Sequence, residues 1–66
     1  MLKDYLGTIS DCNMAIEINP KLGLAYSNRG EAKNMVADKN GGCLDFNKAL
    51  ELGHAAAADL KIKFCQ

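Results

Sequence analysis

Three cysteines and one histidine are the side chains of this chain best suited to metal binding or redox chemistry: Cys12, Cys43, Cys65 and His54. They meet the ligand count of a zinc site, but no CxxC or HxxxH pair brings two ligands together in the sequence. Because the cysteines are odd in number and widely spaced, we expect three reduced thiols rather than a disulfide framework. The sequence therefore predicts no metal site.

Cys43 is the thiol whose surroundings could make it reactive. It lies near the start of an expected helix and close in sequence to Lys39, and a helix N-terminus and a neighbouring cation both lower the pKa of a thiol. The alternative is a small buried apolar residue, which is the commoner role of a free cysteine. The sequence leaves both roles open.

Other classes of function are excluded by what the chain lacks. A single histidine, no paired acid and base, and no glycine-rich phosphate loop predict no enzyme and no cofactor. With 8 basic and 8 acidic side chains the net charge is zero, which predicts neither nucleic-acid nor membrane binding. No apolar run approaches the roughly 18 residues of a membrane span, and no signal peptide is recognisable. Together with reduced thiols, this predicts a cytoplasmic protein.

The elements that position these side chains are expected to be helices in a repeated arrangement. Residues 4–20 resemble residues 38–54 at an offset of 34 residues, a period found in helical repeat proteins. The matched pairs are Asp4 with Asp38, Gly7 with Gly41, Asp11 with Asp45, Asn13 with Asn47, Ala15 with Ala49, Glu17 with Glu51, Ile16 with Leu50, and Ile18 with Leu52.

Apolar residues at three- and four-residue spacing predict about four helices and an all-α fold. The expected helices span about 5–18, 24–36, a third segment ending near 52 after a turn at 38–40, and 56–64. Short connections between them favour antiparallel neighbours.

Several residues mark where these helices begin, end or pack. Asp4 and Asp38 are expected N-caps, Pro20 ends the first helix, and Gly53 suits a helix C-terminus. Gly30 lies in a helix interior, where glycine is about 1 kcal/mol worse than alanine. We therefore expect a neighbouring helix to come close to Gly30.

The chain resembles the tetratricopeptide repeat (TPR) family, a right-handed superhelix of antiparallel helix pairs called A and B. Tyr26 and Gly30 fall on the aromatic and small positions of helix A, and Phe46 and Ala49 on those of helix B; the run AYSNRGEAK is typical of helix A. The resemblance implies a single TPR-like domain over 1–66.

In that register, residues 4–20 are helix B of a partial repeat and residues 23–54 one nearly complete repeat. Residues 55–66 are a C-terminal capping helix or the start of the next repeat. The chain departs from the family pattern at several positions, and each departure is expected to weaken packing or capping locally. Arg29 replaces a usual leucine and Lys33 a usual aromatic, Thr8 and Gly42 replace alanines, and His54 stands where Pro20 stood.

The resemblance implies a non-enzymatic protein-interaction module that binds a peptide or protein in a groove lined by helix A. The groove candidates in this sequence are Ser27, Asn28, Glu31, Asn34 and Lys61, with Met35 and Ile62 beside them. Asn28 matches the asparagine that some members use to hold a terminal carboxylate. The family's cationic positions correspond to Ala58 and Ile62 here, so the alternative is that Asn28 is an ordinary helix-surface residue.

A second function, structural in kind, is self-association through the first helix, giving a homo-oligomer or a helix swap. The resemblance implies that the array is truncated before this helix, which would then expose apolar side chains at Leu6, Ile9 and Cys12. Repeat arrays generally need about three units and polar caps. We therefore expect either self-association or origin as a piece of a longer array.

Overall fold

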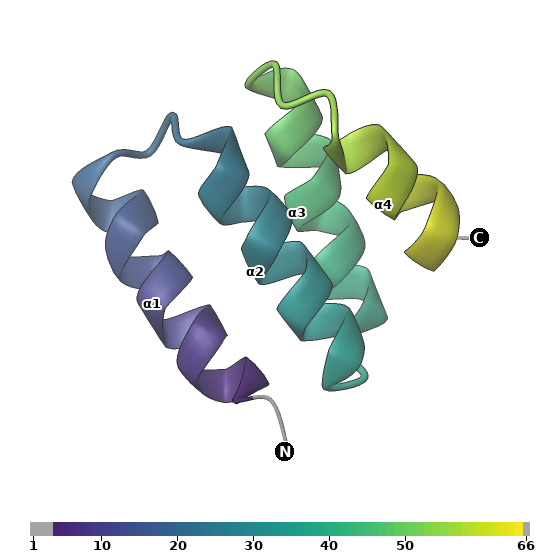
Figure 1. Cartoon of the computed structure of the whole chain (residues 1–66), viewed down its shortest axis with the longest axis horizontal. Coiled ribbons are helices and arrows are strands. Elements are labelled where there is room, and N and C mark those ends of the chain that lie inside the picture. The colour runs from purple at the N-terminus through teal and green to yellow at the C-terminus, as the bar shows by residue number, and fades with distance from the viewer. Residues whose placement is uncertain (1–3, 66) are drawn as a thin grey trace.

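Four α-helices follow one another in the computed structural model, which describes residues 4–65. They are α1 (Tyr5–Ile18), α2 (Gly23–Met35), α3 (Lys39–Glu51) and α4 (Ala57–Phe64). Figure 1 shows them side by side in chain order, each antiparallel to the one before it. The chain measures about 32 × 31 × 19 Å, and the all-α fold of antiparallel helix pairs is confirmed.

The helix ends follow local chemistry. The Gly7 N–H donates to Asp4 Oδ1 at 2.8 Å, and the Gly41 N–H donates to Asp38 Oδ1 at 3.0 Å, so both expected N-caps are confirmed. Because Asp38 caps α3 directly, that helix begins at Lys39 and the turn expected over 38–40 is shorter. Gly53 follows α3 with a φ of 86°, the left-handed conformation expected there.

The interior is built mostly from small residues around one aromatic side chain. Phe46 is completely buried, and its ring lies 6.1 Å from that of Phe64, centroid to centroid. The other buried apolar residues are Cys12, Ala25, Ala32, Ala49 and Ala57. A Cβ atom at Gly30 would lie 2.8 Å from the Gly42 carbonyl oxygen and 2.8 Å from Phe46 Cε1. The close helix approach expected at Gly30 is therefore confirmed.

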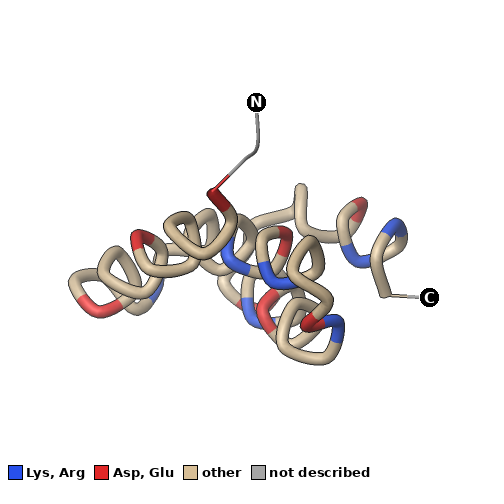
Figure 2. The backbone as a smooth tube through the Cα atoms, turned by 90° about the horizontal axis from the view of Figure 1, so that it is seen from below, with Lys and Arg blue, Asp and Glu red and all other residues tan. Residues whose placement is uncertain are grey.

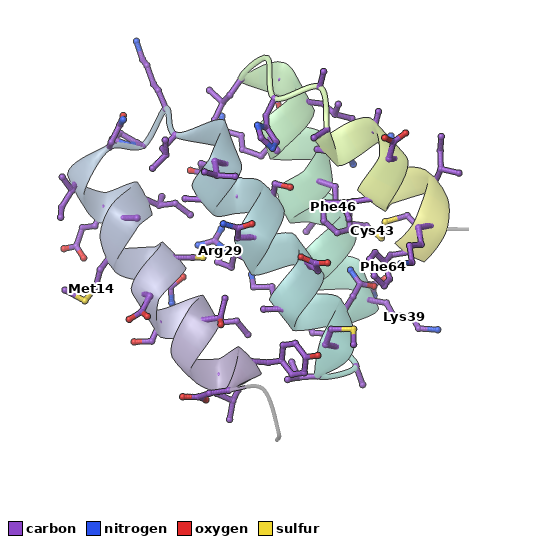
Figure 3. All side chains as sticks on the ribbon, viewed as in Figure 1. Met14, Arg29, Lys39, Cys43, Phe46 and Phe64 are labelled. Atoms are coloured by element: carbon purple, nitrogen blue, oxygen red, sulfur yellow. A yellow bond between two sulfur atoms is a disulfide. The ribbon has the colours of Figure 1, made fainter. Side chains whose placement is uncertain are left out.

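Two of the three cysteines form a disulfide, so the prediction of three reduced thiols is wrong. Cys43 and Cys65 are joined with their Cα atoms 5.9 Å apart, although 22 residues separate them in the sequence. The packing of α4 against α3 brings them together, as Figure 3 shows beside Phe46 and Phe64. Cys43 is thus not a free reactive thiol, and the argument from reduced thiols to a cytoplasmic location is lost.

Arg29 and Lys33, expected to weaken packing, instead meet a buried carboxylate. Asp45 is only 5% exposed. It accepts from Arg29 Nε at 2.9 Å and from Arg29 Nη2 at 2.8 Å, and its Oδ2 lies 3.3 Å from Lys33 Nζ. The two basic residues therefore connect α2 to α3 where the family has apolar contacts.

Candidate functional site

A groove of about 520 Å³ lies between the N-terminal half of α1, the part of α2 from Asn28 to Met35 and the end of α4. A smaller hollow of about 230 Å³ continues along the seam between α1 and α2. Asp11 and Asn28 line both, so we treat the two as one continuous depression. Its apolar walls include Tyr5, Ala32, Met35 and Phe64.

Only part of the predicted groove set lies in this groove. Asn28 and Glu31 line it and are exposed. Ser27 is 2% exposed, contrary to expectation, because it faces the packed interior. Asn34 Nδ2 donates to the Gly30 carbonyl oxygen at 3.0 Å within its own helix, so this amide is engaged inside α2. Lys61 is exposed but does not line the groove.

Four charged residues line the groove. Glu31 was predicted there, whereas Asp4, Asp11 and Lys63 were not assigned to a groove from the sequence. Three carboxylates therefore face one ammonium group. The seven-residue interval between Asp4 and Asp11 places both on one helix face, which is the signal in the sequence that could have found them.

This charge distribution bears on the carboxylate-binding role considered for Asn28. A clamp for a terminal carboxylate needs converging cations that make charge-assisted hydrogen bonds. Within the described residues, the groove around Asn28 offers Lys63 as its cation beside Asp4, Asp11 and Glu31. The groove therefore favours a cationic ligand over an anionic one.

Figure 2 shows the same asymmetry over the whole fold: the described part of α1 carries acidic charges, whereas α2, α3 and α4 each carry lysine or arginine.

The residues predicted for self-association are only partly exposed. Leu6 is 70% exposed, Ile9 is half-buried, and Cys12 is 8% exposed. Cys12 lies on the face of α1 that packs against α2. It is therefore buried within the fold, whereas the sequence predicted that it would be exposed to another molecule. Met14 and Ile18, at 60% and 83% exposure, were missed, and Figure 3 shows Met14 at the outer side of α1.

Cys12 is the free cysteine among the described residues, and its burial limits the reactivity of the thiol. Burial raises the pKa of its thiol above the ordinary value, although the nearby Arg29 acts in the opposite direction. Within residues 4–65 no group of three or more His, Cys, Asp or Glu side chains is placed to hold a metal ion. In the same range no helix is both long and apolar enough to cross a membrane.

The paired antiparallel helices and the period of 34 residues define the class of the chain as a helical-repeat protein. Three curated relatives specify the class further. The Nematostella vectensis protein named Tetratricopeptide repeat protein 36 homolog is 36% identical over 58 residues, which are 83% of this chain and 32% of that protein. The chain is thus a TPR-like segment, and the family resemblance is confirmed.

The other two relatives are named RNA polymerase II-associated protein 3. The Xenopus tropicalis protein is 43% identical over 51 residues, and the Xenopus laevis protein is 39% identical over 51 residues. Each match covers 77% of this chain and 8% of the relative. The chain therefore spans between about a twelfth and a third of the length of these proteins. No protein-family profile matches the chain, and no solved structure gives a significant match.

Proposed function

We propose that this chain is a non-enzymatic interaction segment that binds a protein or peptide partner in the groove between α1, α2 and α4. The observation that carries the proposal is the groove itself: about 520 Å³, with exposed Asn28 and Glu31 on one helix and apolar walls beside them. Binding sites of this kind combine apolar surface with a few polar groups that orient the ligand. In this proposal residues 4–20 act as helix B of a partial repeat and residues 23–54 as a nearly complete one.

The relatives support the class of function rather than the partner. One is named for the repeat, and two are named for their association with RNA polymerase II, which is a relationship between proteins. Because the matches cover small parts of these relatives, we infer protein binding for this chain and do not infer that it associates with RNA polymerase II. The cytoplasmic location stays a prediction, because the Cys43–Cys65 disulfide removes the argument from reduced thiols.

Site-specific photo-crosslinking tests the groove. A photoreactive amino acid replaces Asn28 in the groove or, as control, Leu44, which is 68% exposed on α3 and outside the groove. We expect partner proteins in a cell lysate to be crosslinked from position 28 and not from position 44. Glu31→Lys should reduce crosslinking from position 28 because it reverses one charge of the groove. Equal crosslinking at both positions, or none at position 28, would reject the proposal.

A second candidate function is self-association through α1, favoured by the exposed apolar side chains of Leu6, Met14 and Ile18. In this alternative a second copy covers α1, and the chain acts as an assembly element. Light scattering after size exclusion, over a range of chain concentrations, tests it. We expect a concentration-dependent oligomer that Leu6→Gln and Ile18→Gln together dissociate. A folded monomer at high micromolar concentration would contradict self-association.

A further inference from the structure

The short helix α4 relies on packing for its position. It has eight residues, Ala57–Phe64, and no side chain caps its N-terminus, whereas Asp4 and Asp38 cap α1 and α3. An isolated helix shorter than about 12 residues is marginal in water. Within residues 4–65, α4 packs against α3 and, to a smaller extent, against α2.

A ring contact and a disulfide hold the C-terminal end of α4 against α3. The Phe64 ring stacks on the Phe46 ring, with 6.1 Å between the two centroids. The next residue, Cys65, is bonded to Cys43. Figure 3 shows Cys43, Phe46 and Phe64 together on this side of the fold. The position of Phe64 therefore depends on the disulfide beside it.

The same end of α4 forms one wall of the groove. Phe64 supplies apolar surface there, and Lys63 is the cation of the groove among the described residues. These two residues directly precede Cys65 in the sequence. The disulfide therefore fixes the part of α4 that borders the groove.

The disulfide is open to attack by a thiol. Cys43 and Cys65 are both half-buried rather than enclosed in the core. Lys39 lies one turn before Cys43 on α3, where its ammonium group favours Cys43 as a thiolate. In thiol–disulfide exchange, the sulfur that is more stable as a thiolate is the better leaving group. We therefore expect an incoming thiol to attack Cys65 Sγ and to release Cys43.

We propose that the Cys43–Cys65 disulfide is a redox switch of the groove: the oxidised chain binds its partner, and reduction releases the end of α4 and weakens binding. This inference rests on the proposed interaction function and adds its regulation. After reduction, Phe64 belongs to a marginal helix that has lost its covalent bond to α3, so the groove loses a fixed wall.

Glutathione represents the class of reductant that the switch requires, a small soluble thiol. One glutathione thiolate attacks Cys65 Sγ and forms a mixed disulfide, while Cys43 leaves as a thiolate and takes up a proton. A second glutathione thiolate attacks the glutathione sulfur of the mixed disulfide, which releases Cys65 as a thiol together with oxidised glutathione. Two glutathione thiols are oxidised, and two electrons and two protons pass to the cysteine pair. Oxidised glutathione restores the bond by the reverse steps.

The other helix contacts do not involve the disulfide. Arg29 and Asp45 connect α2 to α3 through two hydrogen bonds, and Cys12 is buried where α1 packs against α2. Reduction should therefore act locally, on α4. Loss of the helical signal of the whole chain in circular dichroism on reduction would show instead that the fold requires the bond, and would rule out a local switch.

Hydrogen exchange measured by NMR tests the release of α4. The Cys65 N–H donates to the Lys61 carbonyl oxygen at 2.8 Å, and in α1 the Asn19 N–H donates to the Ala15 carbonyl oxygen at the same distance. Both donors directly follow their helices, so they are a matched pair. Reduction should accelerate exchange at Cys65 by more than about tenfold and leave Asn19 within about twofold. No acceleration at Cys65, or equal acceleration at both, would contradict the proposal.

Alkylation with iodoacetamide and mass spectrometry test whether a physiological thiol operates the switch. In excess reduced glutathione, Cys43 and Cys65 should both be alkylated rapidly, whereas Cys12 should react slowly because it is buried. Dilution into oxidised glutathione should restore the bond. A bond that persists in excess reduced glutathione would be a permanent crosslink, and the inference would be wrong.

Photo-crosslinking from position 28 then measures the effect on partner binding. The oxidised chain and the double variant Cys43→Ser, Cys65→Ser are compared in the same lysate without reductant. The double variant should give at least about fivefold less crosslinked product, because the apolar wall at Phe64 is lost. Reductant should lower crosslinking of the wild type to the same level and leave the double variant unchanged.

The switch and the proposed function fail separately. Equal or greater crosslinking from the double variant would refute the switch and leave the interaction function standing. Crosslinking from neither form would reject the interaction function and, with it, the regulation.

Discussion

Arg29 and Asp45 form a two-bonded ion pair that fixes α2 against α3, with Nε to Oδ2 at 2.9 Å and Nη2 to Oδ1 at 2.8 Å. The parallel hydrogen bonds use the planar fork of the guanidinium group, which matches a carboxylate. Hydrogen bonding to Asp45 raises the pKa of Arg29. Arg29 Nη1 also donates to Asn13 Oδ1 at 2.9 Å, and its guanidinium carbon lies 5.2 Å from the Tyr26 ring centroid. One side chain thus connects three helices.

Asp45→Asn should destabilise the fold by about 3 kcal/mol, because it removes the buried anion that pairs with Arg29 and Lys33. We take the lower end of the usual range because the two basic side chains remain partly exposed, at 18% and 24%. Urea unfolding followed by circular dichroism measures the effect. The repeat-equivalent change Asp11→Asn is the control and should stay within about 0.5 kcal/mol. Equal effects of the two changes would show that the ion pair does not stabilise the fold.

Reduction of the Cys43–Cys65 disulfide should lower stability by about 3 kcal/mol in the chain-entropy account, given the 22-residue separation. Since 1 kcal/mol shifts the melting temperature of a domain this small by roughly 4–8 °C, Tm should fall by more than about 10 °C. Thermal melts with and without reductant measure this. The double variant Cys43→Ser, Cys65→Ser should melt at the reduced temperature and be insensitive to reductant. An unchanged Tm in the wild type would contradict the expectation.

Gly30→Ala should destabilise the chain by about 2 kcal/mol, although alanine is the better helix former, because the new methyl group overlaps a carbonyl and a packed ring. The matched control is Gly41→Ala in α3, where the added methyl group meets only the flexible Asp38 side chain. That change should cost no more than about 1 kcal/mol, comparable to loss of an N-cap. If Gly30→Ala were stabilising in urea unfolding, the close approach of α2 and α3 would be wrong.

Ala37 and Gly53 form a natural pair for testing helix C-termini. Both residues have positive φ, 69° for Ala37 and 86° for Gly53, and glycine adopts this conformation without the side-chain penalty. Ala37→Gly should therefore stabilise the chain by up to about 1 kcal/mol, and Gly53→Ala should destabilise it by a similar amount. Differential scanning calorimetry gives both shifts. Changes of the same sign would contradict the assignment.

The Cys12 thiol should react slowly with iodoacetamide in the folded chain. Burial raises the pKa of Cys12, so the folded state holds the thiol proton more tightly than the unfolded state does. The linked contribution to stability is complete below the unfolded-state pKa and is lost as the pH rises above it. We expect one fast-reacting thiol per chain in denaturant, and slow reaction under native conditions at neutral pH. Equal rates in the two conditions would show that Cys12 is accessible.

The elements were predictable because their signals are local. Asp4 and Asp38 cap helices through amides three residues away, and Gly53 adopts a conformation set by its own backbone. The position of Gly30 inside a helix predicted that a neighbouring helix comes close, but the sequence did not identify that helix. The ends of the helices agreed within about two residues, as expected when an N-cap fixes one end.

The candidate site was less predictable because its residues meet across helices. Ser27 shares a helix with Asn28 and Glu31, and only the packing of α2 against its neighbouring helices decided that Ser27 is buried. Asp11 was visible as a repeat match, yet its exposure depends on which helices lie against α1. A signal for Asp45 was present: it lies three residues after Gly42 and four before Ala49, on the helix face of these small residues, and a carboxylate buried there requires a cationic partner.

The sequence by itself determined the helices, their caps, the period of 34 residues and the family resemblance, because each depends on spacing along one chain. Tertiary structure alone decided the Cys43–Cys65 bond, the pairing of Asp45 with Arg29 and Lys33, and the burial of Ser27 beside the exposed Asn28. The bonded pairs are separated by 12 to 22 positions in the sequence, and burial depends on which helices lie against a residue. Such relationships arise only when helices pack, so no local pattern encodes them.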